Sequence, residues 1–147
     1  MKRVVATGTF DIIHPGHVYF LREAKKLGDW LGIVISRDTT VLSVKGELPE
    51  HDQNIRRRNV ENLGIADVVV LGYPNDKFQI MQELGPNVVA LGYDQKAFTG
   101  DLKNTLQTRG IFTDIVRLRA FKPHIHKTSL LKKQKNGAAK KNRKTKP

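Results

Sequence analysis

Short apolar segments alternate with amphipathic segments along most of this chain, and that alternation limits its fold more than any other feature. The apolar segments have the length and the valine and isoleucine content of buried strands, and they cover residues 3–6, 29–36, 67–71, 88–91 and 112–118. Segments with helical spacing follow them at 18–27, 54–64, 76–84 and 102–109, with a last helix expected at 127–133. Because strands and helices alternate, we expect an α/β fold in a single domain.

The same alternation predicts how the strands pair. Consecutive strands joined through a helix are parallel with right-handed crossovers, so we expect a Rossmann-like, doubly wound, five-stranded parallel sheet with helices on both faces. In the strand order 3-2-1-4-5, the first and fourth strands are neighbours at the point where the order reverses. Ligands bind past the carboxyl ends of strands at such a point. Residues that follow the first and fourth strands are therefore expected to share one crevice.

The ten residues from Gly8 to His17 follow the first strand and lead into the first helix. Pro15 suits the first turn of a helix, and Gly16 allows a ligand to approach the backbone. Free N–H groups and the positive end of the helix dipole make such a position a natural phosphate site. His14 and His17 lie three residues apart on the helical turn and can both direct donors toward an anion.

Residues 37–53 show no regular pattern, and we predict an irregular loop that is too long to be a passive turn. The next helix begins with Arg56, Arg57 and Arg58, whose positive charges oppose the helix dipole. This conflict would be tolerated if an anion bound there, although one or two of the arginines are expected to be solvated.

Several classes of protein are excluded by composition and by absent motifs. The chain has no cysteine, which excludes disulfides and thiolate metal sites, and no apolar run is long enough to cross a membrane. Neither a Gly-x-Gly-x-x-Gly after the first strand nor a P-loop is present. Because the first residues predict a strand and no signal peptide, a cytoplasmic location is expected.

The net charge of +12 comes mostly from the end of the chain. Ten of the 26 basic residues and no acidic residue lie from Phe121 onward, so the rest has 16 basic and 14 acidic residues and a net charge of only +2. We therefore divide the chain into a domain at 1–133 and a basic tail at 134–147. The tail raises the alternative of a nucleic-acid-binding protein, but it has no aromatic residue after Phe121 on which bases could stack, so nucleic acid is not the expected partner.

Deletion of residues 136–147 is expected to leave turnover near that of the full chain. This segment has no apolar periodicity and cannot bury enough surface to offset the entropy of ordering it, so we expect it to be mobile. Steady-state rates of the full chain and of residues 1–135 test this. Deletion from Lys127 onward should abolish activity, and equal losses in both truncations would contradict the boundary.

The first turn also carries a resemblance to a known family. The signature consists of Thr9-Phe10-Asp11 followed by His14-Pro15-Gly16-His17. It resembles the signature of the cytidylyltransferase-like nucleotidyltransferases, which transfer a nucleotidyl group from ATP or CTP to a phosphate-bearing acceptor and release pyrophosphate. The resemblance covers about residues 1–133 and implies an enzyme that forms no covalent intermediate.

The resemblance implies roles for particular residues. Those implied in catalysis are His14, His17, Lys45 and Arg56. Those implied in nucleotide binding are Thr9, Phe10, His14, Pro15, Gly16, His17, Gly92, Asp94, Thr128 and Ser129. Lys45 would lie near the acceptor and the α-phosphate, Asp94 near the sugar or base, and the helix that starts at Thr128 near the outer phosphates. Solvent exposure of Lys45 and a turn role for Asp94 remain the simpler alternatives.

The segments after the fourth and fifth strands bear on the acceptor. Gly92-Tyr93-Asp94-Gln95 and the ending Lys127-Thr128-Ser129 differ from the glycerol-3-phosphate cytidylyltransferases and look most like the archaeal FAD synthases. That resemblance implies ATP and FMN as substrates and Mg²⁺ or another divalent cation with ATP. A cytidylyl- or adenylyltransferase for a glycerol, sugar or polyol phosphate is the alternative, and the sequence leaves a homodimer open.

Overall fold

The computed structural model describes residues 1–76, 78–93, 95 and 102–121. Its elements follow one another as β1 (Arg3–Gly8), α1 (Pro15–Lys25), β2 (Trp30–Ile35), α2 (Asp38–Lys45), α3 (Gln53–Asn62), β3 (Val68–Leu71), α4 (Gln79–Leu84), β4 (Val88–Leu91), α5 (Leu102–Thr108) and β5 (Asp114–Arg117). The five strands form one sheet in the order β3-β2-β1-β4-β5, and every neighbouring pair is parallel. The predicted fold class, strand order and connectivity are confirmed.

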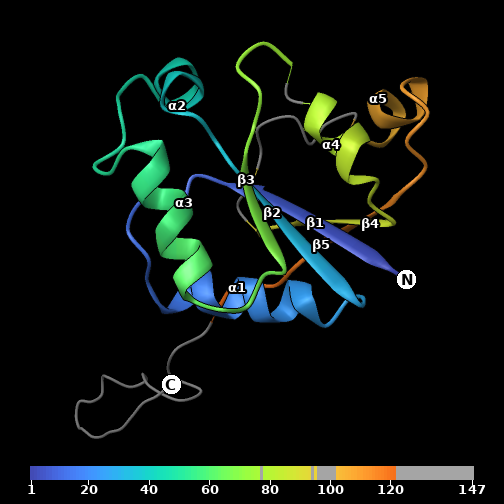
Figure 1. The fold of residues 1–147 in the computed structure, drawn as a ribbon. Helices are drawn as coiled ribbons and strands as arrows, with labels where there is room; N and C mark the ends of the chain where they lie inside the picture. Colours follow the sequence, from blue (N-terminus) through green and yellow to red (C-terminus); the bar gives the residue numbers. More distant parts are fainter. Residues whose placement is uncertain (77, 94, 96–101, 122–147) are drawn as a thin grey trace, which may run out of the picture.

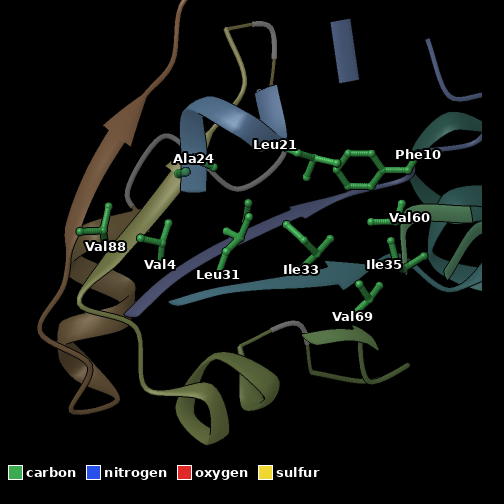
Figure 2. Packing of buried hydrophobic residues seen from close by; sticks show 12 residues of the cluster. Val4, Phe10, Leu21, Ala24, Leu31, Ile33, Ile35, Val60, Val69 and Val88 are labelled. Atoms are coloured by element: carbon green, nitrogen blue, oxygen red, sulfur yellow. The ribbon is translucent and has the colours of Figure 1, made fainter. Parts of the chain in front are cut away.

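Two layers of helices cover the sheet (Figure 1). Alternate residues of a strand face opposite sides, so Val4 and Ala6 pack toward α1 and α3, whereas Val5 packs toward α4 and α5. Figure 2 shows the first of these cores, in which Leu21 and Ala24 of α1 lie over the side chains of β1 and β2. The burial of the central strands β1, β2 and β4 explains why their segments are largely apolar.

One element contradicts the sequence prediction. Residues 37–53 were predicted to be irregular, and that prediction is wrong, because residues 38–45 form α2. The segment contains two threonines and two valines, which are weak helix formers, so its local pattern favours a loop. Docking decides the conformation: Val41 is buried, Asp38 lies in the first turn where a negative charge suits the dipole, and Gly46 ends the helix in a left-handed conformation.

The remaining boundaries shift by a few residues. Helix α1 begins at Pro15 and not at residue 18, and β5 occupies the centre of the predicted segment 112–118. The predicted helix at 127–133 and the tail at 134–147 lie outside the described residues. Within the described part of the chain, no helix is both long enough and apolar enough to cross a membrane.

Candidate active site

The carboxyl ends of β1 and β4 lie side by side in the centre of the sheet. The two strands pair directly from Val4 with Val88 to Ala6 with Ala90. After β4, the side chain of Gln95 reaches across to Thr7 of β1, and its Nε2 donates to the Thr7 Oγ1 at 3.0 Å. The structure therefore brings the segment that begins at Gly8 and the segment that begins at Gly92 to one edge, as the topology predicts.

His14 and His17 cap the N-terminus of α1 reciprocally. The Nδ1 of His14 accepts from the amide of Gly16 at 3.1 Å, and the Nδ1 of His17 accepts from the amide of His14 at 3.2 Å. Both Nδ1 atoms therefore act as acceptors, so in the neutral rings the proton lies on Nε2. The cap fixes the orientation of both imidazoles at the end of the helix that favours negative charge.

The two imidazoles stack on each other, and the tilted ring of Phe10 lies beside them. The rings of His14 and His17 are 3.8 Å apart between centroids and inclined by 27°, and the ring of Phe10 lies 5.3 Å from that of His17. Gly16 must lack a side chain, because a Cβ there would come within 2.9 Å of the His14 ring. Gly8 must also stay small, because a Cβ would come within 2.6 Å of the Phe10 ring. Both glycines of the motif are explained by these rings.

Phe10 has an unusual backbone conformation. Its φ is 51°, and among the described residues it is the one non-glycine residue with a positive φ. A bulky side chain in this region is strained by about 1–3 kcal/mol, and such strain is retained where the surroundings fix it. The Phe10 ring is 5% exposed and packs in the core that Figure 2 shows, so its burial helps to hold the strained backbone in place.

Arg56 of α3 is fully buried and forms a hydrogen bond to the loop that follows β1. Its Nη1 donates to the Thr9 carbonyl at 2.9 Å, its Nε to the His51 carbonyl at 2.9 Å, and its Nη2 to the Asp38 carboxylate at 2.7 Å. Each guanidinium nitrogen is therefore occupied by the chain itself. The resemblance implies Arg56 in catalysis, and in the structure its side chain links the loop, α2 and α3.

Asp11 ties the same loop to the segment before α3. Its two carboxylate oxygens accept from the amides of Glu50 at 2.7 Å and His51 at 2.8 Å. Burial alone would raise the pKa of Asp11, but these two hydrogen bonds and the positive charge of Arg56 lower it below its ordinary value of 3.8. The loop is thus anchored on both sides of Phe10.

Replacement of Asp11 by asparagine is expected to lower the stability of the fold at neutral pH and to have little effect in acid. The folded-state pKa lies below the unfolded value, so the native state binds fewer protons, and the carboxylate stabilises the fold above about pH 4. That contribution is lost as the pH falls through the folded-state pKa. Urea midpoints of the wild type and D11N from pH 7 to pH 2 should differ at neutral pH and converge in acid. A constant difference down to pH 2 would contradict the role of the carboxylate.

The charge conflict predicted at the start of α3 is resolved within the chain. Asp52 is the N-cap of this helix, and its Oδ1 accepts from the amides of Asn54 and Ile55 at 2.9 Å. Arg56 pairs with Asp38, and Arg57 lies 3.6 Å from Glu61. Three carboxylates thus offset the arginines, so the arginine run does not require a bound anion.

Lys45 is exposed in the last turn of α2. It lies four residues after the buried Val41 and seven after Asp38, which places the three residues on one side of the helix. Asp38 and Val41 face α3 and the core, so Lys45 lies on the same side of the helix, about 6 Å farther along the axis than Val41. The observed contacts link the loop after β1 to Arg56 and, through Asp38, to the first turn of α2, whereas Lys45 is an exposed residue at the other end of that helix.

Sequence reasoning missed three residues that build the site: Asp11, Asp38 and Gln95. Asp11 stands within the signature and Gln95 within the distinctive segment after the fourth strand, so both could have been chosen as anchors, whereas nothing local distinguishes Asp38. The predicted contacts of Asp94, Thr128 and Ser129 lie outside the described residues. In the part of the chain that is described, no three His, Asp or Glu side chains are arranged to hold a metal ion.

Comparisons with known proteins agree with this geometry. A family model described as cytidylyltransferase-like matches residues 5–136. The chain is 46% identical over 121 residues to a protein named FAD synthase from Aciduliprofundum boonei, covering 82% of this chain and 80% of that protein. It is 41% identical over 134 residues to a protein of the same name from Thermoplasma acidophilum, covering 91% and 94%.

One solved structure is similar to this chain over nearly the whole length of the solved protein. The lipopolysaccharide core biosynthesis protein from Thermoplasma volcanium is 39% identical and superposes with a TM-score of 0.79, covering 83% of this chain and 99% of that one. Since the family match also spans most of the sequence, this chain belongs to the cytidylyltransferase-like family of nucleotidyltransferases.

Proposed function

We propose that this protein transfers the adenylyl group of ATP to the phosphate of FMN and so forms FAD and pyrophosphate. The relatives named FAD synthase support the substrates, since they are similar to this chain over most of its length. The structural observation that carries the proposal is the reciprocal histidine cap at the N-terminus of α1. It fixes two imidazoles beside a helix end that favours phosphate, next to the strand-order reversal where nucleotides bind.

The reaction needs alignment and charge stabilisation more than acid–base chemistry. An oxygen of the FMN phosphate, already an anion, attacks the α-phosphorus of ATP, and the bond from that phosphorus to the pyrophosphate oxygen breaks. The electron pair leaves with pyrophosphate, so no general base and no covalent enzyme intermediate are required. Fixed donors that face the developing charge lower the barrier because they need no reorganisation during the reaction.

The proposed site residues fall into two groups: those that donate hydrogen bonds to the phosphates, and those that support the loop after β1. His14, His17 and Lys45 are the proposed donors to the phosphates, and the positive end of the α1 dipole adds to their effect. The other proposed contacts to the nucleotide come from the loop after β1, the segment after β4 and the helix expected at 127–133, namely Thr9, Phe10, Pro15, Gly16, Gly92, Asp94, Thr128 and Ser129. We assign Arg56 to the supports, because it holds the Thr9 carbonyl and has no nitrogen left without a partner in the chain.

A divalent cation would enter with the nucleotide. The described residues offer no cluster of ligands for a resident ion, so the fit is to a cation carried by the triphosphate as part of the substrate. Bound there, Mg²⁺ would neutralise charge on the leaving pyrophosphate.

Purified protein incubated with ATP, FMN and Mg²⁺ is expected to produce FAD and pyrophosphate in equal amounts. Chromatography with flavin fluorescence detects FAD, and a coupled assay detects pyrophosphate. Riboflavin is the matched control, because it carries the same ring system without the phosphate that attacks. Parallel reactions with CTP and with glycerol 3-phosphate or a sugar phosphate test the other acceptors. Pyrophosphate release with CTP and glycerol phosphate, and none with FMN, would overturn the proposal.

A further inference from the structure

The turn that follows β4 is held by two side chains that the reaction does not use. It contains Gly92, Tyr93 and Gln95, and the amide of Gln95 donates back to the Gly92 carbonyl at 3.2 Å, as in a β-turn. This turn stands at the strand-order reversal, beside the end of β1. Its shape therefore affects anything that binds in the crevice.

Arg117 fixes the turn from the neighbouring strand. It pairs with Leu91 at the carboxyl end of β5, where β4 and β5 run side by side (Figure 1). Its Nη1 donates to the carbonyl of Gly92 at 2.8 Å, of Gln95 at 3.0 Å and, more weakly, of Tyr93 at 3.4 Å. Three carbonyl oxygens of one turn thus converge on a single charged nitrogen.

Gln95 fixes the turn from the opposite side. Its Oε1 accepts from the Gly92 amide at 3.0 Å, and its Nε2 donates to the carbonyl and the hydroxyl of Thr7 at 3.2 and 3.0 Å. One amide group therefore connects the turn to β1, one residue before Gly8. The turn is clamped between β1 and β5, and the loop with the histidines continues directly from the clamped strand.

We propose that Gln95 and Arg117 are positioning residues that keep this turn in the shape that receives the adenosine part of ATP. The inference rests on the proposed function. The clamp holds the residues on either side of Asp94, and it fixes the turn relative to the β1 loop. A turn that is already ordered binds without losing further conformational entropy, so the clamp increases affinity for ATP. The expected effect is on binding of the nucleotide and not on the chemical step.

Replacement of Arg117 by leucine is expected to raise the Kd for ATP, measured by isothermal titration calorimetry, by about tenfold if the competent turn falls to about one tenth of the population. The KM for ATP should rise in parallel while kcat and the KM for FMN stay close to wild type. Arg117→Lys should recover most of the affinity, because one ammonium group carries three donors and the structure uses a single nitrogen of Arg117. Hydrogen exchange at the amides of Gly92 and Gln95, which are hydrogen-bonded within the turn, should be faster in the leucine variant and near normal in the lysine variant.

Arg109→Leu is the matched control. Arg109 is an arginine of similar exposure to solvent that pairs with Asp76 and not with the turn, so its loss should leave the Kd for ATP unchanged. Thr7→Val removes the hydroxyl that accepts from Gln95 and provides an independent variant if Arg117→Leu does not fold. Unchanged ATP affinity in folded Arg117→Leu or in Thr7→Val, or no recovery in Arg117→Lys, would overturn the inference. If the wild-type protein binds ATP but makes no FAD, FMN is excluded as the acceptor, and the inference about the turn is unaffected.

Discussion

Replacement of Arg56 by alanine is expected to lower the free energy of unfolding by about 3 kcal/mol, a large share of the stability of a domain of this size. The side chain is fully buried, and its loss leaves the Thr9 and His51 carbonyls and the Asp38 carboxylate without their donor. This loss is at the lower end of the range for breaking a buried ion pair, because the Asp38 side chain is 30% exposed and water can hydrate it once Arg56 is gone. Chemical denaturation followed by circular dichroism measures the loss.

Two further variants separate the charge of Arg56 from its shape. Arg56→Lys keeps the charge but cannot donate along three directions at once, so most of the loss should remain. Arg58→Ala removes an exposed arginine from the same helix and should change stability by less than about 0.5 kcal/mol. Equal stability of R56A and the wild type would show that the three hydrogen bonds of Arg56 make no net contribution to the free energy of unfolding.

Replacement of His17 by asparagine is expected to lower kcat by about 10²-fold, the cost of removing one fixed donor to the developing charge. Asparagine is chosen because its side-chain oxygen can still accept from the His14 amide, as the Nδ1 of His17 does. The helix cap should survive, whereas the donor at the position of Nε2 is lost. Steady-state rates with ATP and FMN, together with a thermal melt, measure both effects.

The melt decides how the rate is interpreted. If His17 stabilises transition-state charge, H17N should melt near the wild type and still turn over slowly. H17A lacks both the acceptor and the donor, so it should lose stability as well as rate. Normal turnover in folded H17N would exclude the proposed role, and equal melting of H17A and H17N would show that the cap contributes little.

What could be predicted from the sequence depends on how far apart the interacting residues lie. The histidine cap connects residues two and three positions apart, so the local pattern is sufficient to predict it. The strand order follows from alternating segments, each of which carries its own periodicity. The contact of Arg56 with Thr9 spans 47 positions, and that of Asp11 with His51 spans 40, and no local pattern encodes either.

The failed prediction of an irregular segment at residues 37–53 has this cause. Helix α2 exists because Val41 and Asp38 dock on the rest of the domain, although the intrinsic preference of the segment is weak. The arginines of α3 raised the expectation of an anion, because the sequence does not show that Asp38 and Glu61 pair with two of them. The proposed roles of Lys45, Asp94, Thr128 and Ser129 stay predictions that rest on resemblance.

The left-handed backbone of Phe10 determines whether the histidine motif could work outside this protein. The segment from Gly8 to His17 is contiguous and short, and it looks transferable to any chain with a strand, a turn and a helix. Yet the forces that hold Phe10 in its strained conformation come from Arg56 and from the amides of residues 50 and 51. A graft without those partners would relax at Phe10 and swing the imidazoles away from the helix end. A graft of the motif into another protein would therefore also need to include α3 and residues 50 and 51 before it.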